Sequence, residues 1–267
     1  MMKLTMLGTG NALVTECYNT CFILDDGGQL LLVDGGGGNG VLHQIRAAGY
    51  DWKQIHHIFV THKHIDHILG IIWMMRMICQ YTNQGTYHGD AYIYSHKEII
   101  DLLRDMAGKL LQKKEAALID QKLHLVEVQD GESLEIIGHP FTFFDILSTK
   151  AKQFGFVMGY GEGKKLTCCG DEPLNPALES LAQGSDWMLH EAFCLHGQAD
   201  VFHPYEKHHS TVKDACESAE RLGIKNLLLY HTEDKNLANR KALYGQEGAQ
   251  SYHGELWIPD DLETLTL

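Results

Sequence analysis

The pattern of apolar and polar positions predicts an α/β chain. Short runs of β-prone apolar residues are separated by turn residues or by segments with helical spacing. Apolar residues at 41, 42, 45 and 48, followed by Gly49, predict a helix. Asp25-Asp26-Gly27-Gly28 is typical of a hairpin turn. The strands expected in the first part of the chain are 4–7, 21–24, 30–33 and 58–60.

The rest of the chain continues this alternation. The apolar run 68–79 predicts a buried helix, and Ser95 with Glu98 three positions later predicts a capping box that starts another. A helix is also expected to begin near position 211 and to end near Gly223. The remaining strands are expected at 91–94, 166–169 and 227–230, and, within a second sheet, at 123–128, 134–137 and 141–147.

Composition narrows the class of protein. The chain has 267 residues, 44% of them hydrophobic, and no evident linker, so a single domain over 1–267 is expected. A net charge of −13 argues against broad nucleic-acid affinity. Seven cysteines without a CxxC pair predict neither a disulfide framework nor a cysteine zinc site, so a reduced, cytoplasmic protein is expected. No secretory signal or membrane span is expected, because the most apolar run falls short of the ~20 residues needed.

The most informative stretch is Thr61-His62-Lys63-His64-Ile65-Asp66-His67, which follows an apolar strand and precedes an apolar helical run. In an extended loop, His62 and His64 project to the same side and can share one metal ion. Asp66 and His67 lie just beyond and are placed to serve a second ion. Four such groups beside a core are costly unless they bind something. Imidazole and carboxylate together suit zinc, with manganese or iron as alternatives.

This stretch resembles the HxHxDH signature of the metallo-β-lactamase fold hydrolases. Further segments resemble the ribonuclease Z branch of that superfamily: Leu7-Gly8-Thr9-Gly10, Gly170-Asp171, His190-Glu191-Ala192-Phe193, His209-Ser210-Thr211, and His231 after the last apolar strand. The resemblance extends from position 7 to about position 234. It implies the metallo-β-lactamase fold, an αββα sandwich of two mixed β-sheets flanked by helices.

The resemblance also implies a centre with two divalent metal ions. Four strands would deliver polar groups to one rim, where α/β architectures place their chemistry. The expected ligands are His62 and His64 for the first ion, Asp66, His67 and His231 for the second, and Asp171 for both. Two such ions activate water near neutral pH. The implied activity is therefore that of a ribonuclease Z-like phosphodiesterase.

Three residues are expected to be catalytic by the same resemblance: Asp66, Glu191 and His209. His209, steadied by Glu191, would protonate the departing oxygen, because the pKa of histidine lies near neutrality. His190 is interpreted as structural. For Asp34 the residues alone leave two readings open, a plain turn aspartate or a residue that orients a metal ligand, and the family has the second.

The sequence departs from the family at the third motif. In the family, a histidine five residues before a Phe-Gly dipeptide completes the first metal site, and counting back from Phe154 reaches Thr149. Because a threonine hydroxyl is a poor zinc ligand, the first site is expected to hold metal more weakly, or to use water or a different side chain. Lys150 and Lys152 attract an anionic substrate, stand in electrostatically for a lost ion, or only solubilise the loop.

A second departure concerns the substrate. Ribonuclease Z enzymes that act on tRNA precursors usually carry a protruding arm between the matching positions of Thr149 and Asp171, and here these positions are 22 residues apart. Two strands and a turn use all of them, although an arm from elsewhere or from a partner subunit stays open. The expected substrate is therefore a smaller phosphodiester, such as a cyclic nucleotide or a short oligonucleotide. A homodimer is expected, because relatives in this branch are commonly dimers.

Two other functions remain open at this stage. The same fold supports thioesterases and lactonases, although the segments at His190 and His209 point to the phosphodiesterase branch. The chain is alternatively a non-catalytic metal-binding protein, a sensor or scaffold, because Thr149 replaces a ligand.

Overall fold

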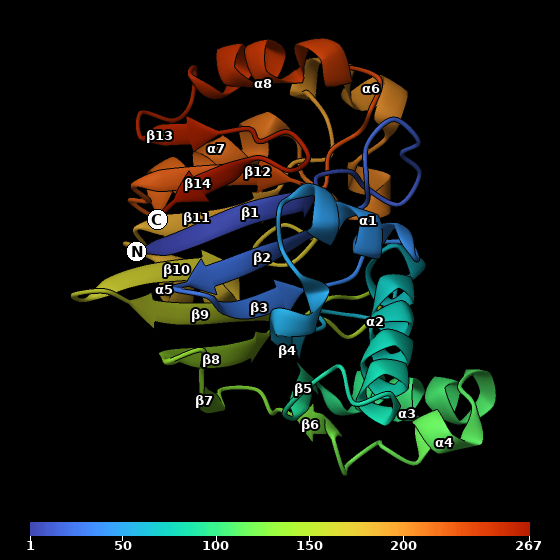
Figure 1. The fold of residues 1–267 in the computed structure, drawn as a ribbon. Helices are drawn as coiled ribbons and strands as arrows, with labels where there is room; N and C mark the ends of the chain where they lie inside the picture. The colour runs from blue at the N-terminus through green and yellow to red at the C-terminus, as the bar shows by residue number, and fades with distance from the viewer. The chain divides into compact units, whose positions relative to one another are not determined.

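The computed structural model describes residues 1–267, which form two compact units. Unit 1 comprises Met1–Gly8, Tyr18–Gln129 and Leu262–Leu267, and unit 2 comprises Thr9–Cys17 and Asp130–Asp261. Each unit has its own seven-stranded sheet (Figure 1). The expectation of one domain over 1–267 stays a prediction.

The sheet of unit 1 is mixed. Its strand order is β14-β1-β2-β3-β4-β5-β6. The pairs from β14 to β3 are antiparallel, whereas β3, β4, β5 and β6 run parallel to one another. The carboxyl ends of those four strands therefore lie along one edge. The bounds are β1 Met2–Gly8, β2 Cys21–Asp26, β3 Gln29–Val33, β4 Ile55–Phe59, β5 Ala91–Ser95, β6 Leu123–Glu127 and β14 Thr264–Thr266.

Four helices belong to unit 1: α1 Gly40–Ala47, α2 Ile65–Asn83, α3 Lys97–Leu110 and α4 Lys113–Ala116. Alternate strand residues, such as Ile58 and Ile93, form one buried core with helix residues such as Ile71 and Leu103. Successive side chains of a strand point to opposite faces of the sheet, so every second residue packs against the helices. The packing fixes the start of α2 at the end of β4, where the candidate metal loop lies.

The sheet of unit 2 is also mixed, with the order β13-β12-β11-β10-β9-β8-β7. Strands β10 to β13 are parallel, and β7 to β10 are joined by antiparallel pairs. The bounds are β7 Ser133–Ile136, β8 His139–Asp145, β9 Phe154–Tyr160, β10 Lys164–Cys168, β11 Trp187–Glu191, β12 Asn226–Tyr230 and β13 Glu255–Trp257. The helices are α5 Glu179–Ala182, α6 Ala199–Phe202, α7 Val212–Arg221 and α8 Arg240–Gly248.

The helices of unit 2 pack on the parallel strands. Val212 and Ala219 of α7 and Tyr244 of α8 share a buried core with Met188 of β11 and Leu227 of β12. Thr211 is the N-cap of α7 and forms a capping box with Asp214. This cap fixes where the chain turns from the segment around His209 into the helix.

Two local predictions were wrong. Ser95 does not cap α3: its hydroxyl donates to the backbone oxygen of Val60 at 2.6 Å, and the N-cap is His96. The strand 123–128 was assigned to the second sheet, but β6 pairs in parallel with β5 and so belongs to the first. The apolar pattern of a strand predicts that the strand is buried, but it does not predict which strand lies next to it.

All seven cysteines are free thiols. No helix of the structure combines the length and the apolarity that a bilayer span requires.

Candidate metal centre

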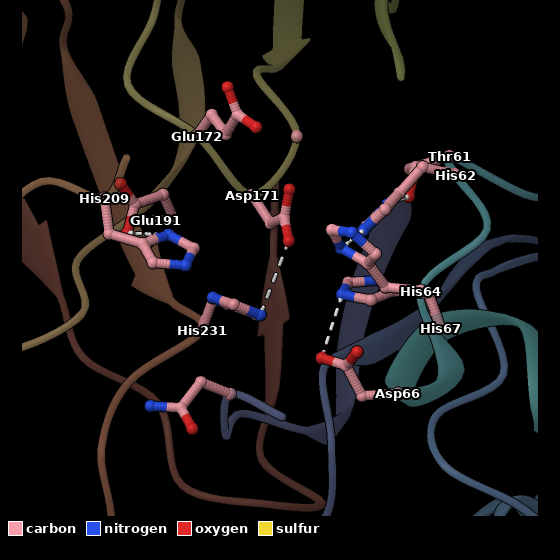
Figure 2. Close-up of polar contacts among 12 residues, drawn as sticks. Thr61, His62, His64, Asp66, His67, Asp171, Glu172, Glu191, His209 and His231 are labelled. Carbon is pink, nitrogen blue, oxygen red and sulfur yellow. Dashed lines mark hydrogen bonds and ion pairs between the residues drawn. The ribbon is translucent and has the colours of Figure 1, made fainter. Parts of the chain in front are cut away.

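The metal loop of unit 1 connects β4 to α2. His62 is buried within the loop, and Asp66 and His67 lie in the first turn of α2 rather than before it. The rings of His64 and His67 have their centroids 4.5 and 4.2 Å from that of His62. Figure 2 shows these side chains gathered at the start of the helix. Unit 1 thus brings together all four of its predicted ligands.

Asp34 orients two of these histidines through a hydrogen-bond network. Its Oδ1 accepts from the Thr61 backbone N–H at 2.8 Å, and its Oδ2 accepts from the Thr61 hydroxyl at 2.7 Å. Because that hydroxyl proton is used, the hydroxyl accepts from His62 Nδ1, 2.9 Å away. His67 Nδ1 donates to Asp34 Oδ2 at 2.7 Å. Both histidines are therefore protonated at Nδ1 and direct Nε2 toward the ligand position, the arrangement typical of metal-binding histidines.

The glycine run after β3 allows this close approach. Gly35 donates its N–H to the His67 backbone oxygen at 2.8 Å, and Gly70 donates to that of Gly36 at 3.0 Å. A Cβ on Gly70 would lie 1.8 Å from the Gly35 oxygen. Only glycine fits between the two backbones. The run therefore packs Asp34 against the first turn of α2.

The acidic surroundings of His67 favour a cation. Burial would lower the pKa of His67, but the carboxylates of Asp66 and Asp34 together hold that pKa well above its usual value. Asp66 Oδ2 lies 3.3 Å from His67 Nε2, and both side chains are buried. A buried positive charge at this point is stabilised by two carboxylates. The same field favours a divalent ion.

Unit 2 places a polar group after each of three neighbouring parallel strands. Gly170-Asp171 follows β10, Glu191 ends β11, and His231 follows β12. Because these strands are parallel and adjacent, their carboxyl ends share one edge of the sheet. Asp171, Glu191 and His231 are each at most 3% exposed. Burial of this many ionisable groups is costly without a charge to balance them.

Asp171 and His231 are spaced as two ligands of one ion. His231 Nε2 lies 3.6 Å from Asp171 Oδ2 (Figure 2), which is too long for a hydrogen bond. Two ligands at about 2.1 Å from a tetrahedral zinc ion are roughly 3.4 Å apart. The side-chain amide of Gln153 holds the other carboxylate oxygen, Oδ1, and its Oε1 accepts from the Asp171 backbone N–H at 2.8 Å. The donor atoms and their spacing fit a divalent metal.

Glu191 and His209 form a buried pair beside His231. His209 Nδ1 lies 3.6 Å from Glu191 Oε2, and the His209 ring stacks on Phe193 with centroids 4.8 Å apart. Glu191 Oε1 also accepts from the Ser210 hydroxyl at 2.6 Å. One ligand-type atom from each of Glu191, His209 and His231 lies within 4.8 Å of the others. The pair therefore lies next to a candidate metal ligand.

His190 has a structural environment, as interpreted from the sequence. Its Nε2 accepts from the Leu174 backbone N–H at 3.3 Å, and its Nδ1 therefore donates to the Glu191 backbone oxygen at 2.7 Å. Burial lowers the pKa of His190 and keeps its ring neutral. Both ring nitrogens are used within the fold.

The profile of the family described as Anti-Pycsar protein Apyc1 matches residues 2–252. The chain belongs to this family. Among curated relatives, the ribonuclease Z of Streptococcus gordonii is 24% identical over 316 residues and covers both chains fully. Among solved structures, the metallo-β-lactamase fold protein YhfI of Bacillus subtilis has a TM-score of 0.78 at 18% identity and full coverage of both chains. The short form of human tRNase Z has a TM-score of 0.72 at 21% identity, covering 99% of this chain and 98% of its own.

These likenesses confirm the predicted fold class. Each unit of this Apyc1-family chain has a mixed seven-stranded sheet with its own helices, and the matched structures carry the metallo-β-lactamase fold over the whole length. The resemblance to the ribonuclease Z branch is confirmed as well.

Thr149 of the Apyc1-family chain lies in the exposed loop after β8. Its hydroxyl contacts His208 Nδ1 at 3.5 Å. Lys150 donates to the Lys207 backbone oxygen at 2.8 Å and lies 3.5 Å from Glu172, and Lys152 lies 3.9 Å from Asp145. Both lysines therefore contact neighbouring groups of unit 2.

The residue that sequence reasoning missed is Gln153. It directly precedes β9, is 1% exposed, and contacts Asp171 through both ends of its amide. The available signal was a glutamine directly before an apolar strand, because a polar side chain that is buried there needs a hydrogen-bond partner. That partner is 18 positions away, so the residues around Gln153 do not predict which residue it is.

Substitution of Gly170 tests how tightly the turn at Gly170-Asp171 packs against Gln153. The φ of Gly170 is +83°, and an added Cβ would lie 2.2 Å from Gln153 Oε1, whereas Gly184 has φ +68° with nothing within 4 Å. Both alanine variants should lose about 1 kcal/mol to backbone strain. Gly170→Ala should lose a further 1–3 kcal/mol or so, because the Gln153 hydrogen bonds are displaced. Urea unfolding compares the two variants, and equal losses would contradict the described turn.

Proposed function

We propose that this chain is a metal-dependent hydrolase, a ribonuclease Z-like phosphodiesterase that acts on a small phosphodiester. The observation that carries the proposal is that unit 2 holds two neighbouring pairs of buried ionisable side chains. Asp171 and His231 have the spacing of metal ligands, and His209 with Glu191 lies beside His231. A binding protein needs the first pair only, so the second pair favours catalysis over a sensor or scaffold.

The proposed ligands come from both units. Unit 1 offers His62, His64, Asp66 and His67, with the protonation of His62 and His67 fixed by the Asp34 network. Unit 2 offers Asp171 and His231. That the two groups serve common ions follows from the family resemblance, in which His62, His64 and Asp171 hold the first ion and Asp66, His67, His231 and Asp171 the second. Zinc suits this set best, with manganese or iron as alternatives.

Each residue then has a defined task. Divalent ions held there would supply water activation and charge stabilisation for attack on phosphorus. His209 delivers a proton to the departing oxygen from its Nε2, because its Nδ1 faces Glu191. Glu191 faces that ring at 3.6 Å and keeps it in place, and Ser210 in turn fixes the Glu191 carboxylate. Asp66 supplies negative charge next to His67 and is proposed to be catalytic as well as a ligand.

Two features support a small substrate. Strands β9 and β10 are joined by residues 161–163 only, so they form a plain hairpin with no protruding arm. A cavity of about 330 Å³ in unit 2 is lined by His209, Thr149, His208 and Asn175 among others, a volume at the small end for ligand sites. With the net charge of −13, these features favour a cyclic nucleotide or a short oligonucleotide over a tRNA precursor.

The test is hydrolysis of bis(p-nitrophenyl) phosphate by protein loaded with Zn²⁺ or Mn²⁺. We expect turnover with at least one ion, complete loss after chelation, and recovery when the ion is returned, because the attacking water needs the metal. A cyclic nucleotide and a short oligonucleotide should be cleaved faster than a tRNA precursor. Absence of turnover with both ions, together with hydrolysis of a thioester or lactone in a parallel panel, would contradict the proposal.

The homodimer and the cytoplasmic location stay predictions. Sedimentation of the purified protein measures the first, and fractionation of cells measures the second.

A further inference from the structure

The Asp171 carboxylate is held by the buried side chain of Gln153. The Asp171 backbone N–H donates to Gln153 Oε1 at 2.8 Å, and Gln153 Nε2 donates to Asp171 Oδ1. Because a backbone N–H can only donate, the amide oxygen must face it, and Nε2 must then face the carboxylate. The orientation of the amide is therefore decided by its partners.

The backbone at Asp171 is fixed on its other side as well. The Tyr230 hydroxyl donates to the Gly170 backbone oxygen, which can only accept. Gly170 has a positive φ and packs against Gln153 Oε1. With the backbone and Oδ1 both held, Oδ2 is the oxygen directed toward His231 Nε2, at 3.6 Å.

We propose that Gln153 is a positioning residue that reserves Asp171 Oδ1 for the protein and limits Asp171 to a single metal-binding oxygen, Oδ2. The inference rests on the proposed metal centre and goes beyond it. A glutamine suits this task because its amide is neutral: it directs the carboxylate and leaves its negative charge to the cation, which a lysine or arginine would neutralise. A carboxylate fixed in this way needs no reorganisation when an ion binds.

The test measures zinc affinity in Gln153→Met, which keeps the length of the side chain and removes both hydrogen bonds. Competition with a chelating dye should show 10- to 100-fold or so weaker zinc binding, the usual effect of losing a group that orients a ligand. Gln44→Met is the matched control: Gln44 is a buried glutamine whose Nε2 donates to the Leu7 backbone oxygen at 2.6 Å, in unit 1. It should bind zinc as the wild type does, whatever its melting temperature.

A double-mutant cycle separates positioning from general stability. In an Asp171→Ala background, Gln153→Met should weaken zinc binding by no more than about twofold, because the group it orients is gone. Equal losses in both backgrounds, or an unchanged dissociation constant in Gln153→Met when the wild type binds zinc, would overturn the inference and leave the proposed function standing. A wild type that binds none of zinc, manganese and iron would refute both.

A zinc-bound crystal structure of the wild type decides the matter even if the variant does not fold. Asp171 Oδ2 on the ion with Oδ1 on Gln153 Nε2 supports the inference. Both carboxylate oxygens on metal would overturn it.

Discussion

Asp171→Asn should lower the kcat/KM for bis(p-nitrophenyl) phosphate by about 10³-fold and should reduce the zinc content of the purified protein. Asparagine keeps the size of the side chain but removes the negative charge that faces His231. Loss of a group that stabilises charge in the transition state is commonly worth a rate factor of this order. Steady-state kinetics and elemental analysis on the same preparation measure the two effects.

Asp186→Asn is the matched control for this variant. Asp186 precedes β11, at the amino end of the same sheet, where it accepts from the Lys165 backbone N–H and pairs with Lys225. It should affect stability and leave the zinc content and kcat unchanged. Similar losses of activity in the two variants would show that the carboxyl end of the sheet has no special role.

His209→Ala should lower kcat by an amount that depends on the leaving group of the substrate. For a cyclic nucleotide, whose departing oxygen is strongly basic, kcat should fall about 10²- to 10⁴-fold, the usual value of a general acid. For bis(p-nitrophenyl) phosphate the loss should be less than about tenfold, because nitrophenolate departs without a proton. Kinetics with both substrates test this, and zinc content should not change.

His253→Ala provides the reference. His253 is an exposed histidine that pairs with Glu220 at 3.0 Å, and its loss should leave both rates as they are. If His209→Ala slowed both substrates equally, His209 would act in binding or folding and not in proton transfer.

The sequence predicted the strands and the metal loop because their signals are local. An apolar run ending in His62 and His64 combines a period of two with a cluster of ligand-type side chains. The family resemblance supplied Asp171, Glu191 and His231, and in unit 2 these residues lie close together because β10, β11 and β12 are parallel neighbours. For these residues, the position at a strand end carried the spatial information.

What escaped prediction depends on partners distant in sequence. Ser95 had the spacing of a capping residue, but its hydroxyl donates to the backbone oxygen of Val60, 35 positions away. β6 was assigned to the wrong sheet because pairing is decided by which edge is available. Strand β14 at the end of the chain pairs with β1 at its beginning, a contact that no local pattern contains. The hydrogen bonds between Gln153 and Asp171 likewise join residues that are distant in sequence.

Anomalous scattering at the zinc edge, from crystals grown with Zn²⁺, tests the central claim most directly. The account predicts a strong peak bound by Asp66, His67, His231 and Asp171, and a weaker peak at His62 and His64, because Thr149 brings no imidazole. Zinc bound elsewhere, with none on Asp171 or His231, would contradict it.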